Sequence, residues 1–430
     1  MKLLLRWIGV KDASREERRA TLWLAAMFFC ALSSTFVLRP LRDQFGVAQG
    51  VGRMPHLYGL TLAVTLLFAP CFWWLANRRP SRTFIPLVLH AFAASMVALW
   101  IGFRWIGDYD WSSGGNRWFG EAFWGFFNAF NLAVPTLVWI HAVEHFGRDQ
   151  GLRLFGLIGV GGTLGAICGS ALSSWMTRIG APPSTGAIAS LVLLESACLC
   201  FRGSLPACEA LGTSGRTRPP AAGVLHGLSL LISDRRLLGL AFYMLLIGIV
   251  MTAFAVAQTR LVGERIEGGR SQHAFLGWLE GANQFVVLML QLFATGRLMR
   301  RLPAALFLSL LPALAVLGLS AVRLWPFVLT ISLVQLARRA AQFALEKPAR
   351  EVLYTPFDLE TKHKVKFLLD TFVLRCGDFL GACFHVLVAG GSIGAVAFGT
   401  AGFAAVWAAL GVFLGRRVQA PGKENPDTAQ

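Results

Sequence analysis

Long apolar stretches follow one another along almost the whole chain. Twelve of them approach the length of about 17–25 residues that a helix needs to cross the ~30 Å hydrocarbon layer of a bilayer. They cover residues 20–38, 55–76, 83–106, 118–142, 153–177, 185–201, 237–257, 274–295, 303–322, 325–345, 366–389 and 392–415. Open sheet edges find no partners in lipid, and these runs lack the alternation of a membrane barrel. The pattern predicts an all-α polytopic membrane protein.

Composition agrees with this prediction and removes one function class. The chain is 55% hydrophobic and only 15% charged, with a mean hydropathy of +0.57, which excludes an ordinary soluble globule. The net charge of +17 could indicate nucleic-acid binding, but Lys and Arg gather in alternate connections, as at 2–19, 202–236 and 338–366. This alternation is the positive-inside rule, and it predicts that both termini are cytoplasmic. The expected partner of the basic residues is the lipid bilayer, with no nucleic acid.

The least hydrophobic long stretch, 202–236, divides the chain into two sets of six spans. We therefore expect a cytoplasmic N-terminal segment (1–19), a six-helix bundle (20–201), a cytoplasmic linker (202–236), a second six-helix bundle (237–415) and a cytoplasmic tail (416–430). Within the linker, Val224–Ile232 is predicted to form a helix along the surface. A faint repeat supports the division, because Gly161–Ala166 matches Gly377–Ala382 at Gly, Leu, Gly and Ala. Two repeated six-helix halves resemble the plan of the major facilitator transporters.

The stretch Lys366–Ala382 begins like a membrane span and yet carries two acids and an arginine. In a helix, Arg375 lies ~14 Å and Asp378 ~18 Å beyond Lys366, which is the middle of a ~30 Å hydrocarbon layer. A charge there costs at least ~2.5–3.5 kcal/mol on insertion scales. At ~100° per residue, Asp370, Arg375 and Asp378 share an arc of ~140°. One face of this helix is therefore predicted to be polar and to form part of a transport pathway.

A second charged group closes the first span. Arg39 and Arg42 are three residues apart, and Asp43 is four residues from Arg39, so one helix face offers two guanidiniums and a carboxylate. Guanidinium groups match phosphate or carboxylate oxygens in bidentate geometry. The alternative is a helix end at the outer surface, with the arginines reaching lipid headgroups. Basic residues are disfavoured on that side, which favours a binding role.

The eighth span carries Glu280, Asn283 and Gln284. Glu280 shares a helix face with the other two. These side chains are candidates to line a substrate cavity, and the alternative is a structural hydrogen bond to another helix.

Two further motifs are interpreted as structural. The glycine-rich run Gly156–Gly165 lacks the strand, turn and helix of a dinucleotide loop, and its small residues suit close helix packing in lipid. His141-x-x-Glu144-His145 matches a zinc pattern, but no third ligand and no soluble catalytic domain is evident in the sequence. Nucleophile elbows and Walker loops are also missing from the sequence. We therefore predict no enzyme, no metal site and no cofactor.

Several segments carry a family resemblance. They are Leu38–Arg39 with Arg42–Asp43; Trp139–Glu144 with Asp149–Gly156 and Gly161–Ala166; Phe275–Trp278 with Leu290–Arg297; and Pro348–Pro356 with Lys364, Lys366, Asp370, Arg375, Gly377 and Asp378. Together they resemble the ATP/ADP translocase (NTP/NDP exchange transporter) family, in its free-living bacterial branch. Arg42 stands where those translocases usually carry lysine.

The resemblance implies a major-facilitator-like fold, a bacterial inner membrane location and exchange of a nucleotide or another phosphorylated organic anion. Arg39, Arg42 and Arg375 are then expected to bind the anion, while Asp43, Asp370 and Asp378 hold the arginines. Two other functions stay open. One is a proton-coupled carrier for a different solute, with Asp370 or Asp378 carrying the proton. The other is a membrane protein that keeps the fold and transports nothing.

Overall fold

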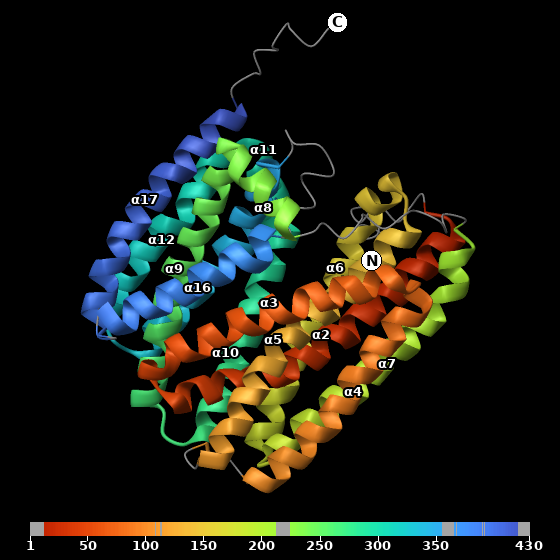
Figure 1. The fold of residues 1–430 in the computed structure, drawn as a ribbon, viewed down its shortest axis with the longest axis horizontal. Helices are drawn as coiled ribbons and strands as arrows, with labels where there is room; N and C mark the ends of the chain where they lie inside the picture. Colours follow the sequence, from red (N-terminus) through yellow and green to blue (C-terminus); the bar gives the residue numbers. More distant parts are fainter. Residues whose placement is uncertain are drawn as a thin grey trace, which may run out of the picture. The chain divides into compact units, whose positions relative to one another are not determined.

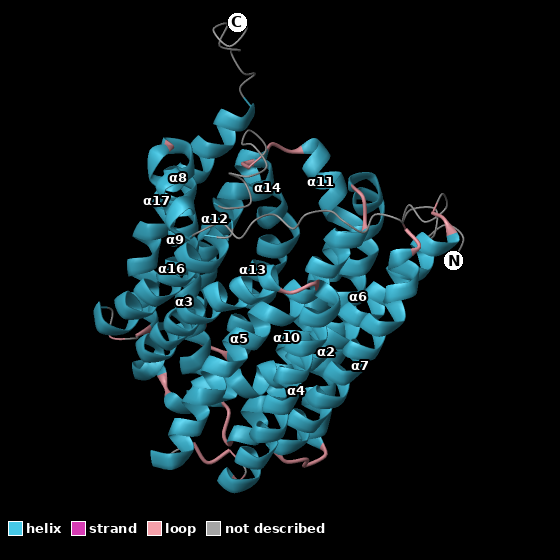
Figure 2. Cartoon of the chain, turned by 45° about the vertical axis from the view of Figure 1, so that its right-hand side comes forward, coloured by secondary structure: helices cyan, strands magenta, loops and turns pink. Residues whose placement is uncertain are grey.

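The computed structural model describes residues 13–107, 109–111, 114–211, 224–354, 365–366, 368–388, 390 and 392–419. These residues form helices and loops and contain no strand (Figure 2). Parts of the predicted N-terminal segment, linker and tail lie outside the described residues, at 1–12, 212–223 and 420–430. The motif residues Thr355, Pro356 and Lys364 also lie outside them.

The described residues belong to two compact units. One takes in those within Met1–Ala221 together with Gln258–Leu288, and the other takes in those within Ala222–Ala257 and Met289–Gln430. The first contains α2 (Arg15–Gln49), η1 (Val51–Arg53), α3 (Met54–Arg78), α4 (Ser81–Ile106), α5 (Gly114–His145), α6 (Arg148–Arg178), α7 (Pro183–Glu209) and nearly all of α10 (Gly269–Leu290). The boundaries predicted for two six-helix bundles stay a prediction.

The second unit contains α8 (Val224–Ser233), most of α9 (Arg235–Arg265), α11 (Gly296–Arg301), α12 (Ala304–Leu324), α13 (Val328–Ala341), α14 (Lys347–Val352), α16 (Leu374–Cys383) and α17 (Ile393–Gln419). Within this unit α12 and α17 lie side by side (Figure 1). The helix predicted at Val224–Ile232 is present as α8.

Nine helices of the described chain are long and apolar enough to cross a bilayer. The other three predicted windows, 274–295, 325–345 and 366–389, lie on helices interrupted by π-helical turns. These turns are η2 (Gln291–Thr295), η3 (Gln342–Glu346), η4 (Leu369–Val373) and η5 (Phe384–Val388). A π-helical turn accommodates an extra residue and occurs frequently at functional sites.

Several helices continue well past their apolar windows. The first window ends at residue 38, but α2 runs for 35 residues to Gln49. A capping box at its start, in which Ser14 Oγ accepts from the Glu17 N–H and Glu17 accepts from the Ser14 N–H, satisfies two backbone donors. Gly50, at φ 75°, ends the helix. The arginines expected at the end of the first span therefore lie inside a helix.

Close packing of α2 against α6 forms the centre of the first unit. Gly161, Gly165 and Gly169 place one face of α6 directly on the backbone of α2. A Cβ on these glycines would lie 2.5, 2.2 and 2.4 Å from the carbonyl oxygens of Ala25, Phe29 and Ser33. Such contacts leave no room for a side chain, which confirms the interpretation of the glycine-rich run as a packing face.

The same arrangement recurs between α9 and α16 in the second unit. A Cβ on Gly377 would lie 2.4 Å from the Leu245 carbonyl oxygen, and one on Gly381 would lie 2.7 Å from the Ile249 Cα. Gly377 and Gly381 are the repeat equivalents of Gly161 and Gly165. The short sequence repeat therefore corresponds to a repeated helix contact, once in each unit.

Candidate functional site

Arg39 and Arg42 lie on the last third of α2. Arg39 is ten residues before the last helical residue, Gln49, or about 15 Å along the axis. The side chain of Arg39 is 23% exposed and that of Arg42 is 17% exposed. The intervening Pro40 has no N–H, so it cannot donate the usual helical hydrogen bond. Both guanidiniums are thus held in a largely buried helix segment.

Each of these arginines has an acidic neighbour. Arg42 forms a 2.5 Å ion pair with Asp43, whose side chain is 23% exposed. Arg39 lies 3.5 Å from Glu280 of α10, whose side chain is only 4% exposed. The amide of Gln284 donates to the same Glu280 oxygen at 2.9 Å, which orients the carboxylate toward the arginine. The structure therefore brings Arg39, Arg42, Asp43 and Glu280 into two adjacent ion pairs.

Aromatic rings flank the same arginines. The Arg42 guanidinium carbon lies 4.6 Å from the Trp124 ring centroid and 5.0 Å from that of Phe127. Phe36 lies 5.1 Å from the Arg39 guanidinium carbon. Trp124 is itself fixed, because its indole N–H donates to the Leu57 carbonyl at 3.0 Å. Ring faces of this kind stabilise a cation by roughly 0.5–2 kcal/mol.

Two polar atoms close to these ion pairs along α2 and α10, the Arg42 Nε and the Asn283 Oδ1, are buried without a hydrogen-bond partner among the described residues. Asn283 is 2% exposed and lies one turn beyond Glu280 on α10. Buried polar groups are nearly always satisfied, so each of these atoms is a place where water or a ligand is expected.

In the second unit, Arg375 and Asp378 form the i,i+3 pair expected from their spacing. The Arg375 Nη1 lies 2.8 Å from the Asp378 Oδ2, and the two side chains are 34% and 13% exposed. Asp378 packs where α16 meets α9, and the Thr252 hydroxyl donates to its backbone carbonyl at 3.2 Å.

Asp370 was expected to hold an arginine of the anion site, but it lies next to Arg350 instead. Its carboxylate is 3.8 Å from the Arg350 guanidinium, whereas Arg375 pairs with Asp378. Arg350 also lies 3.6 Å from Glu346, and these two side chains are only 8% and 1% exposed. The π-helical turns η3 and η4 contain Glu346 and Asp370. The unit therefore holds a cluster in which Glu346 and Arg350 are buried and Asp370 is partly exposed, five residues before Arg375 in the sequence.

The sequence did not single out Glu346 or Arg350 as site residues. The available signal was an acid and a base at i,i+4, directly after an apolar run. Trp124 and Phe127 gave no such signal, because nothing distinguishes them from other apolar residues of their span.

A further polar cluster in the first unit centres on His273 near the start of α10. Its ring nitrogens lie 2.9 Å from the Ser173 hydroxyl and 2.8 Å from the Tyr109 hydroxyl. Next to it, the Ser174 hydroxyl donates to the Ala274 carbonyl at 2.9 Å. These bonds join α10 to the last turns of α6. The cluster was not anticipated, since the three segments are far apart in sequence.

No protein-family model matches this sequence, and no curated protein matches it. Solved structures do match. A variant of the nucleoside transporter NupG is 13% identical at a TM-score of 0.66, over 92% of this chain and 99% of that one. An auto-inhibited POT family peptide transporter is 13% identical at a TM-score of 0.66, over 94% and 97%. The major facilitator transporter FucP, in the outward conformation, is 12% identical at 0.54, over 94% and 99%.

Similarity at this level shows the fold. The predicted fold class, an all-α membrane protein with about twelve spans of the major facilitator type, is confirmed.

Proposed function

We propose that this protein is a membrane transporter that exchanges a phosphorylated organic anion, such as a nucleotide, by alternating access. The observation that carries the proposal is the pair of largely buried arginines inside α2, Arg39 and Arg42, each next to a carboxylate. The major facilitator fold supports it, because solute sites in such transporters lie near the bilayer midplane between repeated halves.

Phosphate is the chemistry that best suits two arginines on one helix face. A guanidinium donates two parallel hydrogen bonds to phosphate or carboxylate oxygens. Burial strengthens the attraction, since two charges interact more strongly at low effective dielectric than in water. The Trp124 and Phe127 rings hold the Arg42 guanidinium in place from one side.

Glu280 is proposed to form an ion pair with Arg39 when substrate is absent. The distance between them, 3.5 Å, is longer than the ~2.7–2.9 Å of a strong charge-assisted hydrogen bond. A phosphate oxygen can therefore compete with the carboxylate for Arg39, while the Gln284 amide continues to donate to Glu280.

Arg375 is also proposed to bind the anion, with Asp378 and Asp370 as counter-charges. The resemblance of Lys366–Asp378 to the ATP/ADP translocases supports this assignment. That resemblance also supports a nucleotide as the anion and a bacterial inner membrane as the location. The distribution of Lys and Arg supports cytoplasmic termini.

The test is counter-exchange in proteoliposomes made with the purified full-length chain. Vesicles are loaded with unlabelled ATP, ADP or a sugar phosphate, and uptake of the labelled compound is measured. Loss of a charge-assisted contact removes about 1.5–3 kcal/mol, so Arg39→Ala and Arg42→Ala should each raise the half-saturating concentration roughly 10- to 150-fold. Arg42→Lys keeps the charge and should lose less.

Arg260→Ala is the matched control, because Arg260 forms an exposed ion pair with Glu264 and should transport normally. Normal exchange by both alanine variants at positions 39 and 42 would refute the site. Uptake that needs no internal substrate and collapses with an uncoupler would indicate the proton-coupled carrier instead. Absence of exchange with every anion, and of any thermal stabilisation by one, would indicate a protein that transports no phosphorylated anion.

A further inference from the structure

A cluster of metal-ligand side chains lies at the ends of α5 and α7, away from the arginine pairs. His141 and His145 are one turn apart at the end of α5, and Cys208 is in the last turn of α7. One ligand atom from each of the three lies within 4.8 Å of the other two. His141 and Cys208 are fully buried, and His145 is 8% exposed.

The spacing of these atoms is close to that of a metal site. The Cys208 Sγ lies 3.9 Å from the His141 Nε2. In a tetrahedral site with bonds of about 2.0–2.1 Å to nitrogen and 2.3 Å to sulfur, the nitrogen and sulfur lie roughly 3.6 Å apart. A shift of a few tenths of an ångström therefore brings the pair to coordination distance.

A hydrogen bond to the backbone prepares His145 as a ligand. The His145 Nδ1 donates to the His141 carbonyl at 2.9 Å, which puts the proton on Nδ1 and the lone pair on Nε2. A metal-binding histidine usually donates its other ring N–H to a group such as a backbone carbonyl. The Ser204 hydroxyl donates to the Phe201 carbonyl at 2.6 Å, so at 2.7 Å it accepts the proton of the His141 Nε2. The lone pair of His141 is then on Nδ1, which is buried with no partner among the described residues. Metal binding at Nε2 therefore requires this proton to move to Nδ1.

We propose that His141, His145 and Cys208 bind a single transition-metal ion of the zinc type that ties the end of α5 to the end of α7. Two imidazoles and a thiolate favour Zn²⁺, Co²⁺ or Cu⁺ over Mg²⁺ and Ca²⁺, which prefer oxygen. Water or the Ser204 hydroxyl, one turn before Cys208, completes the coordination. On binding, the Cys208 thiol loses its proton to solvent and the sulfur forms the metal bond.

The sequence prediction of no metal site rested on the lack of a third ligand for the His141–His145 pair. Cys208 is 63 residues beyond His145 in the sequence, and only the packing of α7 on α5 reveals it. The inference does not depend on transport.

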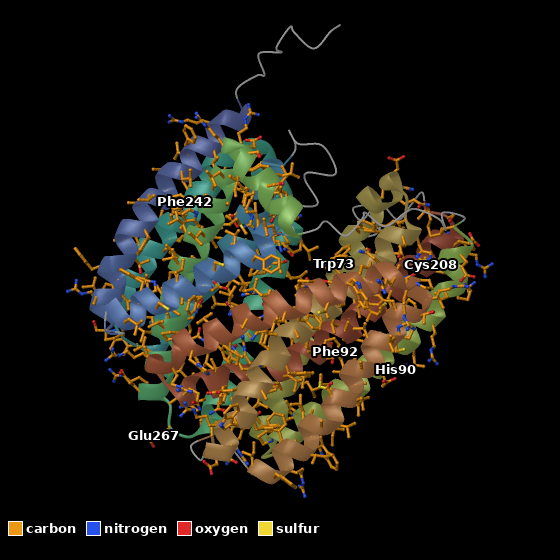
Figure 3. The ribbon with its side chains drawn as sticks, in the orientation of Figure 1. Trp73, His90, Phe92, Cys208, Phe242 and Glu267 are labelled. Carbon is orange, nitrogen blue, oxygen red and sulfur yellow. The ribbon has the colours of Figure 1, made fainter. Side chains whose placement is uncertain are left out.

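A second group in the same unit provides a matched control. His90, Glu195 and Cys198 also lie within ligand distance of one another. His90 already contacts both neighbours, at 2.9 Å to Glu195 and 3.6 Å to Cys198, and its side chain is 45% exposed. Figure 3 shows His90 and Cys208 well apart, so a metal cannot bridge the two groups.

The experiment is a Co²⁺ titration of the purified full-length protein after chelator treatment. A tetrahedral thiolate site should give one equivalent of tight binding, a thiolate-to-cobalt charge-transfer band and displacement of Co²⁺ by Zn²⁺. Zn²⁺ should also raise the melting temperature of the wild-type protein. Cys208→Ser and His145→Gln should each lose the band and the stabilisation, while Cys198→Ser should keep both.

Three results would overturn the proposal. The first is no charge-transfer band in the wild-type protein, which needs no variant to fold. The second is a band that persists in Cys208→Ser. The third is a band lost in Cys198→Ser and kept in Cys208→Ser, which assigns the metal to the other group. Thermal unfolding without metal shows whether each variant is folded. If Cys208→Ser is not folded, His145→Gln provides the test in its place.

Discussion

Substitution of Gly165 by alanine should destabilise the protein, although alanine is the better helix former. A Cβ at this position would lie 2.2 Å from the Phe29 carbonyl oxygen. An ordinary contact is about 3.5–4.0 Å, so α2 and α6 must separate locally by roughly 1 Å or more. Overpacking of this kind costs about 1–3 kcal/mol. The contact is with backbone, so no side chain can rotate away to relieve it.

Gly156 on the same helix provides the opposite expectation. A Cβ there meets nothing within 4 Å, so Gly156→Ala should stabilise α6 by about 0.5–1 kcal/mol through reduced backbone entropy in the unfolded chain. The free energies of unfolding of the two alanine variants should therefore differ by roughly 1.5–4 kcal/mol.

The assay is thermal unfolding of both variants in the same detergent, followed by tryptophan fluorescence. At roughly 2–4 °C per kcal/mol, the two melting temperatures should differ by about 3–16 °C, with Gly165→Ala the lower. The repeat provides a second comparison in the other unit. Gly377→Ala should lower the melting temperature and Gly402→Ala should not, because a Cβ at Gly402 meets nothing within 4 Å. Equal melting temperatures for Gly165→Ala and Gly156→Ala would refute the inference that the helix backbones touch.

Two further predictions concern charges and gating. Glu346→Gln should lower the melting temperature more than Asp370→Asn does. Glu346 is the buried partner of Arg350, so loss of its charge should reduce the free energy of unfolding by about 3–5 kcal/mol. Asp370 is 34% exposed, so its loss should reduce it by at most about 1 kcal/mol, and equal effects would contradict the burial of the Glu346–Arg350 pair. Cysteines introduced at Ser174 and Gly277 should form a disulfide on oxidation, since a Cβ at Gly277 would lie 3.1 Å from the Ser174 Cβ, close to the ~3.5–4.5 Å of a disulfide. If α6 and α10 must separate during alternating access, oxidation should stop transport in the double variant and reductant should restore it, while each single variant stays active; full activity of the crosslinked protein would refute that movement.

The helices were predictable from the sequence because lipid requires apolar runs of a definite length. The residues at which the helices begin and end were less predictable. The window that ended at residue 38 became a helix to Gln49, since protein neighbours, unlike lipid, can accept the polar residues of its last turns. The small-residue face of α6 was also predictable, because glycines at four-residue spacing have few other uses in an apolar helix.

The candidate site was predictable only where its charges are close in sequence. Arg375 with Asp378 was visible as a local pair. Asp43 was placed on one helix face with Arg39 by its spacing, whereas the structure pairs it with Arg42. The contact of Arg39 with Glu280 was not visible, because it joins residues on two helices that only tertiary packing brings together. Cys208 shows the same limit, since its relation to His141 depends on how α7 packs against α5.

The glycine faces of α6 and α16 lie directly on the backbones of α2 and α9. We call each of these two helix pairs a strut. With backbone directly on backbone, neither helix can slide or roll past the other without steric overlap, so each strut moves as one rigid element. Asp378 on α16 is fixed to its strut, and the Arg39–Arg42 segment to the other. The charged groups therefore have positions set by helix packing rather than by flexible loops. Any bending that accompanies the proposed transport falls to segments outside the struts, among them the π-helical turns η2 and η3.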